Sequence, residues 1–167
     1  MTIDEAREQI FDENTFIKGS HCPCCDQFVK KYSRKLNSLR ARSLISLFQQ
    51  NTKIYPVHIS KIAGANTGGE FALLRYWGLI KEARNDRSDK RTSGKWFITA
   101  KGCEFVKNNL QVPAYLFIYN NEPIGFSDEM TTIKEALTSK FDYRELMGDF
   151  YVPPIIKRIA SEQVAML

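Results

Sequence analysis

The chain lacks the features that mark several large classes of protein. None of its 167 residues belong to an apolar stretch near the roughly 18 residues that a membrane-spanning helix needs. Phosphate-binding loops, dinucleotide-binding fingerprints and metalloprotease helices are missing. Only two histidines are present, and no motif pairs either of them with a serine or cysteine nucleophile. We therefore expect a protein that is not an enzyme and that has no membrane partner.

A secretory signal is also missing from the start of the sequence. The first thirteen residues contain five acids and a single base, Arg7, which is the reverse of the charge that a signal peptide carries. Three of the four cysteines lie close together, at Cys22, Cys24 and Cys25. Without a secretory signal, such a cluster indicates metal or redox chemistry inside a cell rather than a disulfide framework.

What is present fits a globular protein with a moderate excess of positive charge. Hydrophobic residues make up 43% and charged residues 26% of the chain, which is typical of one main domain with small additions. The formal net charge is +5 and the isoelectric point is about 9.0. This charge is compatible with a phosphate-rich partner, although many basic proteins bind none.

The positive charge is concentrated in two segments. Residues 30–42 contain six bases and no acid, and a second group of bases lies between residues 81 and 95. Two basic segments that flank one motif predict a single electropositive face that attracts a polyanion. The alternative is an ordinary solvated surface. From the first segment, we expect Arg34, Lys35 and Arg40 to contact phosphates.

Hydrophobic periodicity predicts helices over residues 3–11, 33–50 and 58–63, followed by a turn at 64–66. The longest of these helices has apolar residues at close to the three-and-four spacing of one buried face. These residues are Leu36, Leu39, Leu44, Leu47 and Phe48.

A further helix is predicted over residues 67–77, because Thr67 and Glu70 have the spacing of a capping box. The 3.6-residue period places Phe71, Leu73, Leu74 and Trp77 on its inner face. The outer face and first turn then have the composition of a helix that enters a major groove, where arginine can bond guanine. The predicted contacts are Thr67, Gly68, Gly69, Ala72, Arg75 and Tyr76. Alternatively, the glycines only let two helices approach.

A β-hairpin with a basic tip is predicted directly after this helix. Gly78 ends the helix, strands begin near residues 79 and 96, and the polar segment 86–94 joins them. Thr99 is placed to cap a following helix. Such a hairpin lies along the DNA backbone or inserts an arginine into the minor groove. The expected contacts are Arg84, Arg87, Lys90, Arg91 and Lys95.

Three motifs in this region resemble those of winged-helix transcription regulators of the multiple-antibiotic-resistance type. They are LRYWGLI at 74–80, DRSDKR at 86–91 and FITAKG at 97–102. The resemblance covers about residues 44–109 and implies DNA binding, with Arg75 as a base contact and Arg87 as the wing-tip arginine. The chain departs from the family in two ways. The long dimerisation helices of the family are not evident in this sequence, and the family has no cysteine knuckle like the one at residues 22–25. A Cys-Pro-x-Cys knuckle at 22–25 also precedes YSRKLN at 32–37. In these motifs the whole chain resembles small bacteriophage and prophage proteins, which implies a mobile element acting in a bacterial host's cytoplasm.

The cysteine cluster has the spacing of a zinc knuckle, in which Cys22 and Cys25 bind one ion from a tight turn. A structural zinc site needs four ligands, and no second pair exists in the sequence. His21 or Cys24 would be further ligands, and completion requires either folding across the chain or a symmetric partner. A reduced, metal-free turn and a redox pair are the alternatives.

The C-terminal third predicts a β-hairpin over residues 113–126, then helices near 133–137 and 141–147. Tyr115, Phe117 and Tyr119 share one face of the hairpin, where aromatic rings stack on single-stranded bases or pack against a helix.

We therefore expect an α+β protein with a winged helix-turn-helix core, an N-terminal cysteine knuckle and a C-terminal β-hairpin and helix accessory unit. The expected segments are an arm and knuckle at 1–32, the winged helix at 33–112, the accessory unit at 113–152 and a tail at 153–167. Double-stranded DNA is the expected partner, with structural zinc as a cofactor and homodimerisation left open. The alternatives are a module that binds a host protein, such as a polymerase or defence factor, and single-strand or RNA binding by the hairpin.

Overall fold

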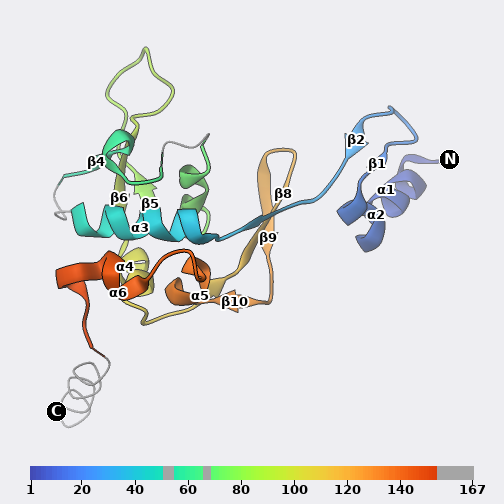
Figure 1. Ribbon diagram of the computed structural model, residues 1–167. Helices are drawn as coiled ribbons and strands as arrows, with labels where there is room; N and C mark the ends of the chain where they lie inside the picture. Colours follow the sequence, from blue (N-terminus) through green and yellow to red (C-terminus); the bar gives the residue numbers. More distant parts are fainter. Residues whose placement is uncertain (51–54, 66–68, 154–167) are drawn as a thin grey trace, which may run out of the picture. The chain divides into compact units, whose positions relative to one another are not determined.

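The computed structural model of the protein describes residues 1–50, 55–65 and 69–153 (Figure 1). The chain divides into two compact units. Unit 1 contains Met1–Leu36 and Pro113–Met130, and unit 2 contains Asn37–Val112 and the residues from Thr131 onward. Short helices and small antiparallel sheets alternate along the chain, which confirms the α+β class. The expected accessory unit 113–152 is divided, because its hairpin belongs to unit 1 and its helices to unit 2.

Unit 1 begins with a helical arm. The expected first helix is confirmed as α1 (Ile3–Phe11), which starts with a capping box between Thr2 and Glu5. Asp12 then caps α2 (Glu13–Lys18). A two-stranded hairpin of β1 (Ser20–His21) and β2 (Phe28–Val29) follows the arm.

The main sheet of unit 1 joins two parts of the sequence. Strand β3 (Tyr32–Lys35) pairs with β8 (Tyr115–Tyr119), which pairs in turn with β9 (Glu122–Phe126). The β8–β9 hairpin was expected, and Asn120 and Asn121 form its turn with φ angles of 50° and 62°.

The helix predicted over 33–50 is wrong at its start, because α3 (Ser38–Gln50) begins five residues later. Residues 32–35 instead form β3 and pair with β8. Pairing with a neighbouring strand outweighs the local helical pattern of these residues. Asn37 accepts a hydrogen bond from the Arg40 backbone N–H at 3.0 Å and so marks the helix entry. Leu44 and Leu47 are buried as expected, whereas Leu39 is 44% exposed.

Unit 2 is built around α3, which packs on one side against a three-stranded sheet and on the other against α4, α5 and α6 (Figure 1). The sheet has the order β4–β6–β5 and is antiparallel. Its strands and the supporting helices are β4 (Val57–His58), β5 (Ile80–Glu82), β6 (Lys95–Ile98), α4 (Ala100–Val106), α5 (Ile133–Leu137) and α6 (Tyr143–Met147). The remaining short elements are β7 (Val112–Pro113), which pairs with β10 (Met130–Thr131), and η3 (Gly148–Phe150).

The two middle helices predicted for the winged helix are much shorter in the structure. Residues 57 and 58 form β4, and only the single 3₁₀ turn η1 (Ile59–Lys61) follows. The helix predicted over 67–77 is replaced by the 3₁₀ helix η2 (Phe71–Arg75). Three of the four residues predicted for its inner face are buried, because Phe71, Leu74 and Trp77 are all at most 2% exposed, whereas Leu73 is half-buried.

The hairpin expected after η2 is confirmed. Gly78 has a left-handed φ of 73°, β5 and β6 pair in the expected order, and Thr99 caps α4 by accepting from the Gly102 N–H at 3.0 Å. Gly102 lies directly against the carbonyl of Leu79, so a side chain there would collide with the backbone. This contact holds α4 against the start of β5. Within the described residues, none of the helices has both the length and the apolar character to cross a membrane.

Candidate nucleic-acid interface

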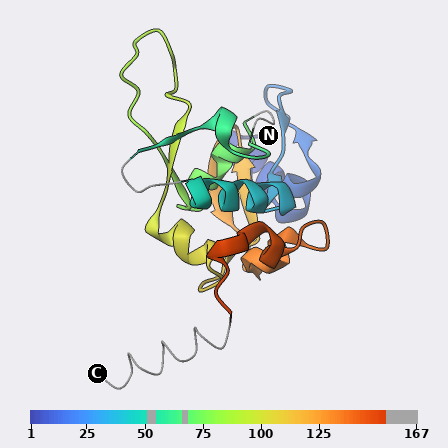
Figure 2. The ribbon, with the colours of Figure 1, turned by 60° about the vertical axis from the view of Figure 1, so that its left-hand side comes forward.

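The loop between β5 and β6, which we call the wing loop (residues 83–94), extends away from the rest of unit 2 (Figures 1 and 2). All five bases predicted in this region have exposed side chains. They are Arg84, Arg87, Lys90, Arg91 and Lys95, the last on strand β6. The structure therefore presents the predicted wing cations to solvent.

Asn85 gives the tip of the wing loop its shape. Its side-chain amide donates to the Lys90 carbonyl, and its side-chain oxygen accepts from the Arg87 backbone N–H at 3.1 Å. At the base of the loop, the Ser93 N–H donates to the Glu82 carboxylate at 3.2 Å. Side chains thus satisfy backbone groups that have no ladder partner, which restricts the loop's conformations. Neither Asn85 nor Glu82 was predicted as a site residue.

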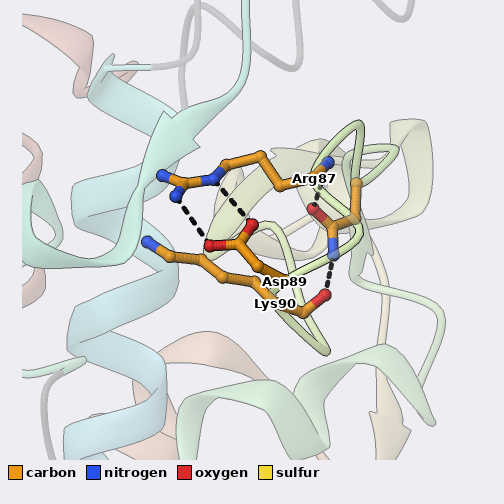
Figure 3. A network of polar contacts seen from close by, with 4 residues as sticks. Arg87, Asp89 and Lys90 are labelled. Carbon is orange, nitrogen blue, oxygen red and sulfur yellow. Dashed lines mark hydrogen bonds and ion pairs between the residues drawn. The ribbon is translucent and has the colours of Figure 1, made fainter.

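Two of the wing cations have acidic partners in the same loop. Arg87 forms a bidentate pair with Asp89, with Nε and Nη2 at 3.0 and 2.8 Å from the two carboxylate oxygens (Figure 3). Arg84 lies 3.6 Å from Asp86. These pairs are more than half exposed, so water screens them and each contributes about 1 kcal/mol at most. A phosphate that approaches the loop can therefore compete for either arginine.

Arg75 is an exposed cation at the end of η2, shortly before strand β5. Its guanidinium lies 4.9 Å from the centre of the Tyr76 ring and donates to the Tyr76 hydroxyl at 3.1 Å. Arg75 is exposed, whereas Tyr76 and Ala72 are half-buried. The outward position predicted for Arg75 is confirmed, on a short 3₁₀ helix rather than on an α-helix.

The predicted first turn of this helix is not helical where the structure describes it. Gly69 is exposed and has a φ of 79°, which lies in the left-handed region and places it in a turn. Thr67 and Gly68 lie outside the described residues. The capping box predicted between Thr67 and Glu70 therefore also lies outside the described residues, and the Glu70 carboxylate pairs with Arg40.

The prediction that Arg40 contacts a phosphate is wrong. Its side chain is 5% exposed, its Nη2 pairs with the Glu70 carboxylate, and its Nε donates to the Glu70 carbonyl at 3.2 Å. It therefore links α3 to the start of η2 and is not available to a phosphate. The signal was present in the sequence, because Arg40 lies midway between the buried Leu36 and Leu44 at four-residue spacing.

Arg34 and Lys35 belong to unit 1, whereas the wing loop belongs to unit 2. Strand β3 aligns Lys35 with Tyr115 and Ser33 with Phe117. The cations of this segment therefore lie over aromatic rings. The cation-to-centroid distances are 5.6 Å for Lys30 and 6.0 Å for Arg34 over Tyr32, 4.0 Å for Lys31 over Phe117, and 5.8 Å for Lys35 over Tyr115.

The cysteines are all reduced, and in the described part of the chain no three His, Cys, Asp or Glu side chains are grouped to hold a metal ion. Comparison with known proteins identifies no relative, because no family model, curated protein or solved structure matches the chain. Any functional conclusion therefore depends on the geometry described above.

Proposed function

We propose that unit 2 is a winged helix that binds double-stranded DNA, and that the protein is a phage or prophage regulator of transcription or of another DNA transaction in the host cytoplasm. One observation carries the proposal: an exposed basic loop joins two strands of a three-stranded sheet directly after a segment that presents an arginine. This combination places several cations on an element that can follow a phosphate backbone.

The order of elements supports a winged helix. The chain runs α3, β4, η1, η2, β5, wing loop, β6 and α4, and β6 lies between β4 and β5. This is a helix, a strand, two helical turns, and a hairpin that returns beside the first strand. The motifs that resemble multiple-antibiotic-resistance regulators fall on η2, the wing loop and the start of α4.

The short length of η2 changes the expected mode of binding. A 3₁₀ helix rises about 2 Å per residue, so η2 (Phe71–Arg75) is about 10 Å long and exposes few side chains to a groove. We therefore assign most of the affinity to phosphate contacts from the wing loop. Arg75, at the end of η2, is the candidate for base recognition, and Arg87 is the candidate for the minor groove.

Replacement of the wing cations tests this assignment. We expect Arg87→Ala/Lys90→Ala/Arg91→Ala to weaken binding of a fluorescent duplex at least about tenfold and to flatten the salt dependence, because three phosphate contacts contribute a slope of about 0.9 each. Arg7→Ala/Lys18→Ala/Lys140→Ala is a matched control that removes the same charge from exposed positions elsewhere. Equal losses in the two variants, or binding by the parent protein that is insensitive to salt, would contradict the proposal.

The same assay separates base recognition from charge. Sequencing of genomic fragments retained by the protein gives its preferred site, and Arg75→Ala should then lose preference for that site while keeping its affinity for unrelated duplexes. Loss of one bidentate guanine contact corresponds to about 1–3 kcal/mol of discrimination. If Arg75→Ala kept the sequence preference of the parent protein, Arg75 would not be a base contact.

A second candidate function is favoured by the sheet of unit 1. Tyr115 and Phe117 on β8 lie beneath Lys35 and Lys31, and aromatic rings beside cations are the elements of a single-strand binding surface. Tyr119 is already packed edge-on against Phe11 and Phe16 of the helical arm. Competition between duplex and single-stranded oligonucleotides distinguishes the two functions.

The other alternative is a module that binds a host protein. If a host protein stays bound to the purified chain after nuclease treatment, that alternative is favoured over DNA binding.

A further inference from the structure

The cysteine knuckle (residues 22–27) forms the tip of the β1–β2 hairpin. The strands align Ser20 with Val29 and His21 with Phe28, and two backbone hydrogen bonds close the turn. The Cys22 N–H donates to the Gln27 carbonyl and the Asp26 N–H donates to the Cys22 carbonyl, both at 2.8 Å. Asp26 reverses the chain with a left-handed φ of 59°. Two main-chain bonds therefore close the turn between Cys22 and Gln27.

The turn places Cys22 and Cys25 in a Cys-x-x-Cys pair at the tip of the β1–β2 hairpin. Such a pair in a tight turn is the arrangement that supplies two thiolates to one zinc ion. Hydrogen bonding by the backbone of Cys24, and then by that of Cys25, also lowers the pKa of the Cys22 thiol.

The knuckle supplies only part of such a site. Zinc takes four ligands in a structural site, and no group of three suitable side chains occurs in the ranges 1–50, 55–65 and 69–153. Nδ1 of His21 is bonded to the Asp26 carbonyl at 2.9 Å, and Cys103 lies on α4 in unit 2. Cys24 and Cys25 are exposed and Cys22 is half-buried, so the sulfur atoms are accessible from outside the chain.

We propose that Cys22 and Cys25 form half of a zinc site that is completed by the same two residues of a second copy of the chain. Two knuckles related by a two-fold axis bring four thiolates to one ion, which is the tetrahedral coordination that zinc prefers. Zinc binds thiolates, so each thiol gives up its proton when the metal binds. The metal joins two chains at the tips of their hairpins, which belong to unit 1, whereas the proposed DNA-binding surface belongs to unit 2.

Titration of the reduced full-length protein with Zn²⁺ or Co²⁺ tests the site. We expect one metal ion for every two chains, a mass by light scattering that doubles as the metal is added, and the intense visible absorption of Co²⁺ bound tetrahedrally by thiolates. A chelator should return the protein to its monomeric mass. One metal ion per chain in a monomer, or no binding at micromolar metal, would overturn the proposal.

Single cysteine variants identify the ligands. Cys22→Ser and Cys25→Ser should each lose metal binding and metal-dependent dimerisation, and main-chain bonds should keep the turn folded in both. Cys24→Ser and Cys103→Ser are matched controls that remove a thiol and should retain both properties. A circular dichroism spectrum of each variant checks its fold. Equal losses in Cys24→Ser, or a Cys22–Cys25 disulfide in place of bound metal in protein purified with a reductant, would also refute the shared site.

Discussion

Every cation of the segment 30–42 contacts an aromatic ring or a carboxylate, whereas the wing-loop cations that form ion pairs do so with acids of the loop itself. In the first segment, five bases lie over rings and Arg40 is buried against Glu70. In the wing loop, Arg84 and Arg87 pair with acids and all the bases remain exposed. Two segments that are both rich in bases therefore have different surroundings. We propose that the cations of the first contribute mainly to structure and that those of the second bind DNA.

The largest effect is expected from Arg40, the most structural of these cations. Arg40→Ala leaves the carboxylate of Glu70 without its partner between α3 and η2. Because the Glu70 side chain is 44% exposed, water can hydrate it, and the expected cost is about 1.5–3 kcal/mol, the range for hydrogen bonds to charged groups. Urea unfolding followed by tryptophan fluorescence measures the loss, because both tryptophans, Trp77 and Trp96, belong to unit 2. Arg42→Ala is the matched control on the same helix, where loss of the contact with Phe141 costs about 1 kcal/mol or less. Similar unfolding midpoints for the two variants would show that Arg40 is not a structural cation.

A smaller effect is expected from the acid that pairs with the wing-tip arginine. Asp89→Asn removes a negative charge from the wing loop and releases Arg87 from its bidentate pair. We expect duplex DNA to bind about threefold to tenfold more tightly at low salt, with the difference falling as salt screens the charge. Fluorescence anisotropy measures the change, and Asp149→Asn controls for the net charge. Weaker binding by Asp89→Asn would mean that the acid positions Arg87 for DNA.

The smallest effect is expected from the cation–aromatic contacts of unit 1. Lys31→Met keeps the aliphatic stem of the side chain but removes the charge that lies 4.0 Å from the centre of the Phe117 ring. We expect the local stability of the β3–β8 pairing to fall by about 0.5–1 kcal/mol, measured by hydrogen exchange of the strand amides. Lys18→Met is the control at an exposed helical position. DNA binding should not change, and a loss comparable to that of the wing variant would assign this segment to the interface.

The local signals in the sequence predicted the elements that depend on near neighbours. The expected capping by Thr99, the left-handed glycine turn at Gly78 before β5 and the Asn120–Asn121 turn are all present, because each is stabilised by bonds within a few residues. The inward positions of Phe71, Leu74 and Trp77 were also correct, because side chains three and four residues apart remain on one face of a short helix.

The errors occur where a distant partner decides the outcome. Residues 33–37 carry a helical pattern, yet the pairing of β3 with β8 depends on residues about 80 positions away. Arg40 has the spacing of a core residue, but a buried guanidinium needs a charged partner. The ion pair with Glu70, thirty residues away, offsets the cost of removing the Arg40 charge from water.

For this protein, the sequence by itself determined the local elements, the concentration of bases in two segments and the paired thiols at Cys22 and Cys25. The tertiary structure decided which bases are exposed, because burial and partners depend on contacts between segments that are far apart in the chain. It also decided that the first basic segment is divided, because Lys30, Lys31, Arg34 and Lys35 belong to unit 1 whereas Arg40 and Arg42 belong to unit 2 with the wing loop. The physical reason is that charge and hydrophobic period are local properties, whereas the desolvation of a charge depends on everything packed around it.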